Sequence, residues 1–211
     1  MLVCVVLSLK AFRLRWPPAF RIFSVLLFTA LLTEIIANAW HYYLHNINGW
    51  TYSDNNAWIY TISLVPQYVL FMLVYYHELH SKNIKKAIIG ACCLFTLFTI
   101  FNFCFWQKPD MINSYTHILA DCIMLLLVFA YFEQLRREKT QVRLKEQPMV
   151  WISLGVLAFH LLNIPFLLSI NYLNINFKIV ATTFLYVYLS FIFMCYVLYS
   201  KAFLCQTPRL K

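Results

Sequence analysis

Residues 22–40 read IFSVLLFTALLTEIIANAW, an apolar run long enough to cross a lipid bilayer. A membrane-spanning helix needs about 20 such residues, because it rises about 1.5 Å per residue through a hydrocarbon core about 30 Å thick. Glu34 interrupts this run. A carboxylate that faces lipid at this depth costs roughly 2.5 kcal/mol or more. We therefore expect the Glu34 side chain to be buried against other helices or to face water.

The whole chain has the composition of a polytopic membrane protein. Its 211 residues are 62% hydrophobic and only 12% charged, whereas soluble domains are about 45–50% apolar and about 25% charged. Full-length apolar segments are expected at 21–43, 57–79, 87–106, 114–134, 149–170 and 178–200. These segments use most of the chain, so residues 1–211 are predicted to form one all-α transmembrane helix bundle without a separate soluble domain.

The first nine residues, MLVCVVLSL, form a shorter apolar segment. A helix of this length rises only about 14 Å, less than half of the hydrocarbon core. Basic residues follow the segment instead of preceding it, which is unlike a signal peptide. We interpret it as the last part of a first transmembrane helix whose beginning is absent from this sequence. The complete bundle is then of the seven-helix type, with its N-terminus outside.

Basic residues mark one side of the expected bundle. Of the 17 Lys and Arg residues, all but Lys108 and Lys178 fall in connections on the same side. The positive-inside rule assigns this side, and with it the C-terminus, to the cytoplasm. Aromatic residues near the opposite boundary, including Trp40, Trp50 and Trp58, agree with this layout. The net charge of +9 does not indicate nucleic-acid binding, because the basic residues are scattered among short connections.

Cysteines and paired histidines give no strong metal signal. The seven cysteines have no CxxC spacing and lie mostly in apolar segments, as expected of small core residues. His77 and His80 are three residues apart at the cytoplasmic end of the segment 57–79, where we expect them to be solvated. No HExxH or HxxxH pair lies wholly within the predicted helices, since His41 and His45 have the HxxxH spacing but His45 follows the segment 21–43.

Polar residues recur at similar depth, in the outer half of the membrane, on several of the expected helices. Residues three, four or seven positions apart share one face of a helix. In the segment 178–200, Thr182 and Tyr186 form a further polar face of this kind. If these faces converge, they line an outward-facing polar cavity. Its candidate ligand-binding residues are Glu34, Asn38, His41, Tyr60, Gln67, His117, Asp121, His160 and Asn163.

Several interpretations of these polar residues compete. They could be interhelical hydrogen bonds that fix the packing, each worth about 0.6 kcal/mol in a membrane. They could instead line a pocket for a small or lipidic ligand. A third hypothesis is a membrane-embedded metal-dependent hydrolase acting on a lipidic substrate, because carboxylates and imidazoles can hold a metal that activates water. A small-solute transporter is less favoured, since the three glycines make no matching Gly/Pro-interrupted segments.

Four stretches occur in order along the chain: the TE of LLTEII, then NNAWIY, INSYTHILAD and PMVWISLGVLAF. With these landmarks the chain resembles a family of small seven-helix inner-membrane proteins common in Bacteroidetes. In that family the carboxylate-bearing helix is the second, preceded by a complete first span that is reduced to nine residues here. The resemblance implies a seven-helix bundle in the inner membrane. It implies no activity, cofactor or catalytic residue.

Together these observations favour a non-enzymatic sensor or ligand-binding module without a cofactor. We expect membrane lipids around the bundle and a small or lipidic molecule in its polar cavity. We further expect a helix shift to reach a cytoplasmic or membrane partner protein through the basic segment 135–147. Nucleic acid is not an expected partner.

Overall fold

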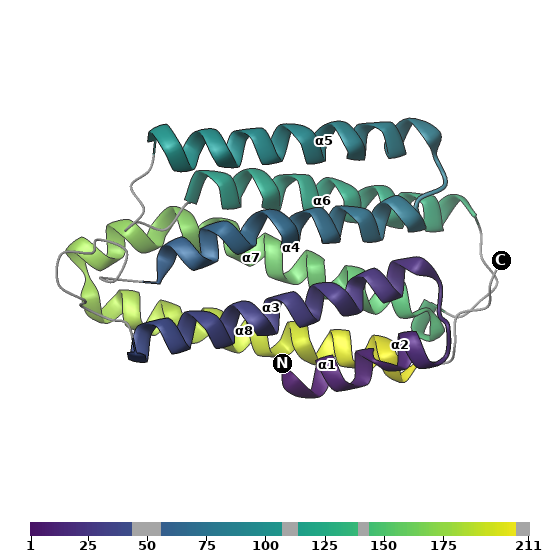
Figure 1. Ribbon diagram of the computed structural model, residues 1–211, viewed down its shortest axis with the longest axis horizontal. Helices are drawn as coiled ribbons and strands as arrows, with labels where there is room; N and C mark the ends of the chain where they lie inside the picture. The colour runs from purple at the N-terminus through teal and green to yellow at the C-terminus, as the bar shows by residue number, and fades with distance from the viewer. Residues whose placement is uncertain (44–55, 107–113, 139–143, 206–211) are drawn as a thin grey trace.

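In the computed structural model, which describes residues 1–43, 56–106, 114–138 and 144–205, long antiparallel helices form a bundle (Figure 1). The long helices are α3 (Pro18–Tyr43), α4 (Ala57–Glu78), α5 (Lys82–Phe101), α6 (Ser114–Arg137), α7 (Pro148–Asn176) and α8 (Lys178–Leu204). The short elements are α1 (Leu2–Ser8), α2 (Lys10–Arg13), the π-helical turn η2 (Asn102–Trp106) and the 3₁₀ turn η3 (Leu144–Glu146). Within the described residues, six helices are long and apolar enough to cross a membrane. The predicted all-α membrane bundle is confirmed.

The two ends of the bundle differ in charge. We call the end that holds α2, the α4–α5 turn and the last turn of α8 the basic end, and the opposite end the far end (Figure 1). Lys10, Arg13, Lys82 and Lys201 all belong to the basic end, as the sequence pattern predicts. Some residues used in that prediction lie outside the described ranges: Trp50, Lys108, Lys139, Arg143, Arg209 and Lys211.

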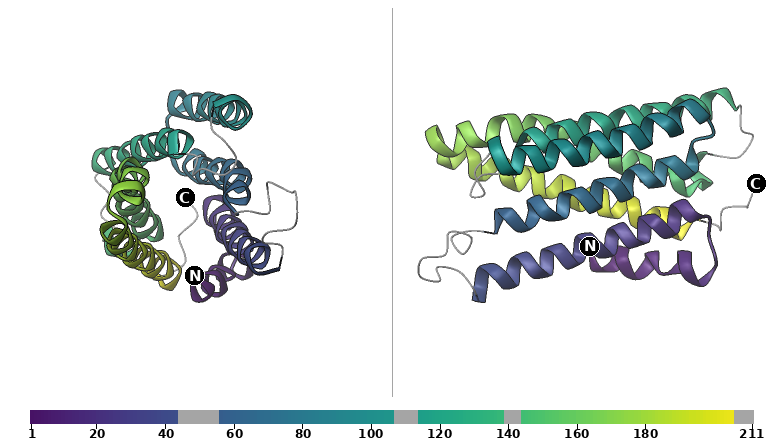
Figure 2. Two further views of the ribbon diagram at one scale, coloured as in Figure 1. Left: turned by 90° about the vertical axis from the view of Figure 1, so that its left-hand side faces the viewer. Right: turned by 45° about the horizontal axis from the view of Figure 1, so that its top comes forward.

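When the bundle is viewed along its axis, α3, α4, α6, α7 and α8 lie around its centre (Figure 2). Around this centre, α4 follows α3, and α6, α7 and α8 complete the arrangement. The remaining long helix, α5, packs on the outside against α4 and α6. The short helix α1 packs against both α3 and α8, but only along the half of the bundle nearer the basic end (Figure 1).

Aromatic side chains fill the interior near the basic end. The Phe23 ring of α3 makes an edge contact with the Tyr199 ring of α8, with centroids 5.1 Å apart. Phe203 stacks on Phe23 at 6.1 Å and on the buried Trp16 at 6.0 Å. Aromatic rings bury large areas and favour offset or edge-to-face contacts. This packing fills the interior at the basic end, and the open space beyond it begins at Tyr199 and extends through the middle of the bundle to Asn56.

Charged residues at the basic end pair near the end of α6. Glu133 accepts hydrogen bonds from Arg136 and from Arg137, with Nε–O distances of 2.8 Å in both cases. Glu133 and Arg137 are four residues apart on one helix, a spacing that favours such a contact. His80 is exposed and its Nδ1 lies 2.8 Å from a carboxylate oxygen of Glu138. These contacts connect the ends of α4 and α6 and lie away from the central cavity.

Candidate functional site

The carboxylate of Asp121 is the centre of a buried hydrogen-bond network. Asp121 lies on α6 and is completely buried. Its Oδ1 accepts hydrogen bonds from the Tyr68 hydroxyl of α4 at 2.8 Å and from His160 Nδ1 of α7 at 2.6 Å. Its Oδ2 accepts one from Asn163 Nδ2 of α7 at 2.8 Å. A buried charge is tolerated only when it is paired and hydrogen-bonded, and these three donors meet that requirement.

The same network extends to α8 through Asn163. The Tyr188 hydroxyl donates to Asn163 Oδ1 at 2.8 Å, while Asn163 Nδ2 donates to Asp121. Both polar atoms of the Asn163 amide are therefore used. His160 and Asn163 are three residues apart on α7, so they leave the helix on the same face. In this way one acidic side chain links α4, α6, α7 and α8.

The two ring nitrogens of His160 have different surroundings. Nδ1 faces the Asp121 carboxylate and donates to it, so in the neutral ring Nε2 carries the free lone pair. Nε2 is buried and makes no hydrogen bond to any residue in the described ranges. Aromatic rings of Tyr68, Phe71 and Phe159 lie around the imidazole, with centroids 5.0 to 6.0 Å away. A buried polar atom without a hydrogen-bond partner lowers the stability of the fold by about 1–3 kcal/mol, so a partner for Nε2 would be stabilising.

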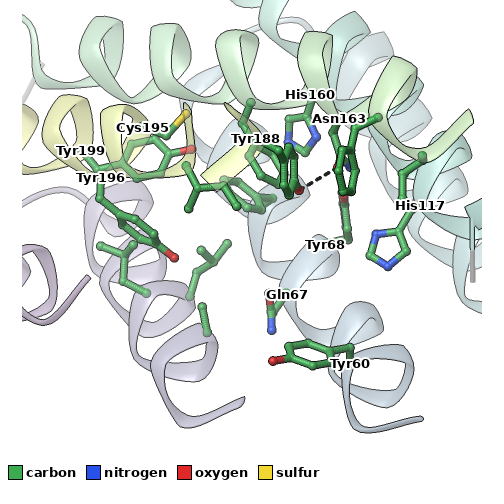
Figure 3. A pocket seen from close by; sticks show the side chains of 18 of the residues that line it. Tyr60, Gln67, Tyr68, His117, His160, Asn163, Tyr188, Cys195, Tyr196 and Tyr199 are labelled. Carbon is green, nitrogen blue, oxygen red and sulfur yellow. Dashed lines mark hydrogen bonds between the residues drawn. The ribbon is translucent and has the colours of Figure 1, made fainter. Parts of the chain in front are cut away.

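A cavity of about 460 Å³ lies beside this network. Figure 3 shows His160, Asn163 and Tyr188 on one side of it, with Gln67 and Tyr60 across from them. Asp121 does not itself line the space, but holds three side chains that do. Most of the remaining lining is apolar or aromatic. The lining residues are Leu26, Leu27, Ala30, Asn56, Tyr60, Thr61, Gln67, Tyr68, Phe71, His117, Phe159, His160, Asn163, Phe166, Leu167, Tyr188, Ile192, Cys195, Tyr196 and Tyr199.

Six of the nine residues predicted from the sequence gather at this site. Asp121, His160 and Asn163 form direct hydrogen bonds. The other three line the cavity with His160 and Asn163 and are Tyr60, Gln67 and His117. Gln67 Nε2 donates to Thr33 Oγ1 of α3 at 3.2 Å. The His117 ring makes an edge contact with Tyr68, with centroids 6.4 Å apart.

The other three predicted residues lie on an exposed face of α3. Of the two expected environments for Glu34, burial against other helices is not observed, because its side chain is exposed and accepts a hydrogen bond from the Tyr60 hydroxyl at 3.1 Å. Asn38 Nδ2 donates to the backbone carbonyl of Glu34, and His41 is also exposed. None of these three lines the cavity. The spacing places them correctly on one face, but the rotation of α3 turns that face away from the centre.

The sequence analysis identified Tyr60 but missed two other tyrosines of the site, Tyr68 and Tyr188. Tyr68 and Tyr188 complete the network, whereas Tyr186, which was expected on the inner face of α8, is 66% exposed. Tyr196 and Tyr199 also line the cavity. A tyrosine in an apolar segment resembles a core or interfacial aromatic residue, so its hydroxyl gives little signal.

The arrangement does not assemble the ligand set of the hydrolase hypothesis. Among the residues that the structure describes, no group of three or more His, Cys, Asp or Glu side chains is placed to hold a metal ion. Glu34 and His41 do not line the cavity. Asp121 and His160 form a hydrogen bond with each other. The site therefore places hydrogen-bond donors and acceptors beside a cavity lined mainly by aromatic and apolar side chains.

Comparison of the chain with family models, curated proteins and solved structures finds no match.

Proposed function

We propose that the protein is a non-enzymatic ligand-binding module of the inner membrane, which holds a small amphipathic or lipidic molecule in the central cavity. The observation that carries the proposal is the pairing of an aromatic cavity of about 460 Å³ with one convergent polar side. Ligand pockets are typically concave, mostly apolar and about 300–1,000 Å³ in volume, with a few polar groups that fix orientation.

The polar end of such a ligand would meet His160. Asp121 fixes the imidazole and leaves Nε2 without a partner among the described residues. A ligand hydroxyl or amide N–H that donates to Nε2 satisfies this buried atom. The apolar part of the ligand lies against Phe71, Phe166 and neighbouring aromatic side chains of the cavity. Binding thus combines burial of apolar surface with one oriented hydrogen bond.

The location of the network suggests how occupancy could be sensed. Asp121 belongs to α6 while His160 and Asn163 belong to α7, and these two helices lead into the predicted partner-binding segment 135–147. A ligand that binds one arrangement of these helices more tightly shifts the population towards it. A change in the α6–α7 contact would then reach a partner protein at the basic end.

Filling the cavity tests the proposal directly. Ala30 lines the cavity, whereas Ala39 is exposed on the same helix. We expect Ala30→Phe to abolish most of the recovery of a specific small molecule or lipid that copurifies with the full chain. Ala39→Phe should leave that recovery unchanged, because its ring points away from the interior. The measurement is mass spectrometry of organic extracts from equal amounts of each purified protein.

Thermal unfolding distinguishes loss of ligand from loss of fold. Extract from the parent protein should raise the unfolding temperature of stripped parent and of Ala39→Phe, but not of Ala30→Phe. The proposal fails if all three folded proteins recover the same molecules in the same amounts, or if none of them carries more than bulk membrane lipid.

A further inference from the structure

A second cavity lies at the basic end, on the outer flank of the bundle. It has a volume of about 620 Å³ and is separate from the central cavity, with which it shares no lining residue. It lies between α1, α2 and the last turn of α8. Its lining residues are Val6, Leu7, Leu9, Lys10, Arg13, Leu14, Phe203 and Leu204.

The lining is divided between apolar and basic side chains. Val6, Leu9 and Leu204 are 64%, 57% and 63% exposed, so their side chains are open to the surroundings of the bundle. Lys10 and Arg13 are the charged residues of the lining, and none of its members is acidic. The cavity therefore combines an apolar wall with a net positive charge at the basic end of the bundle.

Lys10 is held in place within this cavity. Its Nζ donates to the carbonyl of Phe203 at 3.1 Å and to the carbonyl of Cys205 at 3.3 Å. The ammonium also lies 5.4 Å from the centre of the Trp16 ring, where a cation is attracted to the aromatic face. These contacts use two of its three hydrogens and leave one for a further acceptor. Lys10 is thus a fixed positive charge in the lining.

Arg13 supplies the second, more available charge. It is exposed and lies three residues after Lys10, on the same side of the short helix α2. Its guanidinium makes no hydrogen bond or ion pair with any residue of the described ranges. The five N–H groups of a guanidinium match the oxygens of a phosphate in a bidentate manner. An arginine without a protein partner beside a fixed lysine therefore fits a phosphodiester.

We propose that this cavity binds an anionic phospholipid from the leaflet at the basic end, with its phosphate between Lys10 and Arg13. The acyl chains would lie along Val6, Leu9 and Leu204, which no soluble phosphate could cover. Basic pockets between helices on the cytoplasmic side are a known mode of lipid headgroup recognition. The site is independent of the central cavity and of the function proposed for it.

The test is competitive lipid binding to the full chain, measured by native mass spectrometry from mixed micelles. Equal amounts of phosphatidylglycerol and phosphatidylcholine are added to the parent, to Arg13→Gln and to Arg21→Gln. Arg21 is an exposed basic residue near the start of α3 and does not line the cavity, so its variant is a control with the same loss of charge. We expect Arg13→Gln to reduce the preference for phosphatidylglycerol about fivefold. This is the change in binding expected from losing one Lys or Arg near an anionic membrane surface.

Further arms separate the sources of the signal. Arg13→Lys should retain most of the preference, because it keeps the positive charge, and inorganic phosphate at millimolar concentration should compete poorly. Equal losses in Arg13→Gln and Arg21→Gln would overturn the proposal in favour of unspecific attraction to the basic end. Complete displacement of the lipid by inorganic phosphate would also overturn it, because the apolar wall would then contribute nothing.

Discussion

At the scale of single residues, Asp121 has the most demanding position in the chain. A completely buried carboxylate in a membrane helix is stable only if its environment replaces water. Tyr68, His160 and Asn163 do so with three donated hydrogen bonds. Glu34 differs, because its side chain is exposed and its carboxylate accepts a hydrogen bond from the Tyr60 hydroxyl at 3.1 Å. The two acids should therefore respond differently to the same substitution.

Replacing each acid by its amide tests this difference. In Asp121→Asn an amide N–H₂ takes the place of one carboxylate oxygen and faces a donor, so at least one hydrogen bond is lost. We expect the free energy of unfolding to fall by about 1–3 kcal/mol. Glu34→Gln should change it by less than about 1 kcal/mol. Thermal unfolding in detergent, followed by circular dichroism, compares the two variants. Equal effects would contradict the central position of Asp121.

The convergence of polar side chains could be predicted where burial requires them to pair. Asp121, His160 and Asn163 could be identified because polar residues deep in apolar segments need partners. Their neighbour Tyr68 could not, since a tyrosine hydroxyl is compatible with core, interface and network positions. The exposure of Glu34 depends on the rotation of α3, which is fixed by packing against α4 and α1. Periodicity identifies a shared face but not the direction in which that face points.

At the scale of helices, α7 and α8 pack closely against each other at Gly155 of α7. A Cβ atom added at Gly155 would lie 2.5 Å from Cε1 of the Tyr199 ring. Tyr199 is buried and also contacts Phe23, so its ring has little freedom to move. Gly90 on α5 is the opposite case, because no atom lies within 4 Å of its would-be Cβ.

Alanine at these two glycines is a matched pair of tests. We expect Gly155→Ala to lower the free energy of unfolding by about 1–3 kcal/mol, because overpacking must displace Tyr199. Gly90→Ala should be neutral or stabilising by up to about 1 kcal/mol, because alanine favours the helix. Unfolding temperatures of both variants, measured in the same detergent, provide the comparison. A Gly155→Ala protein as stable as the parent would show that α7 and α8 pack less closely than described here.

Helix positions could be predicted more accurately than helix ends. The apolar segments match the six spanning helices, but α7 continues to Asn176, beyond the expected end at residue 170. Polar residues at a helix end can keep the backbone hydrogen bonds of the helix after its apolar run has finished. The helices α4 and α7 also continue through Pro66 and Pro165, which neighbouring helices in a membrane permit.

At the scale of the whole molecule, aromatic packing fills the interior at the basic end, and the central cavity lies beyond it in the middle of the bundle. The alternation of charged connections predicts which ends lie together, and the antiparallel arrangement agrees with it. The cavity volume could not be predicted from sequence, because it depends on how side chains from five helices meet across the centre. In the function proposed above, the polar network beside this cavity would orient the ligand.

The most direct measurement is an experimental structure of the full chain purified in lipid nanodiscs without stripping of bound molecules. If the central cavity binds a ligand as proposed, we expect continuous density of an amphipathic molecule there, with a polar atom about 3 Å from His160 Nε2. The bond between His160 Nδ1 and Asp121 should be present in the same structure. The proposal would be contradicted if aromatic side chains closed the central cavity and His160 Nε2 formed a hydrogen bond to another protein group.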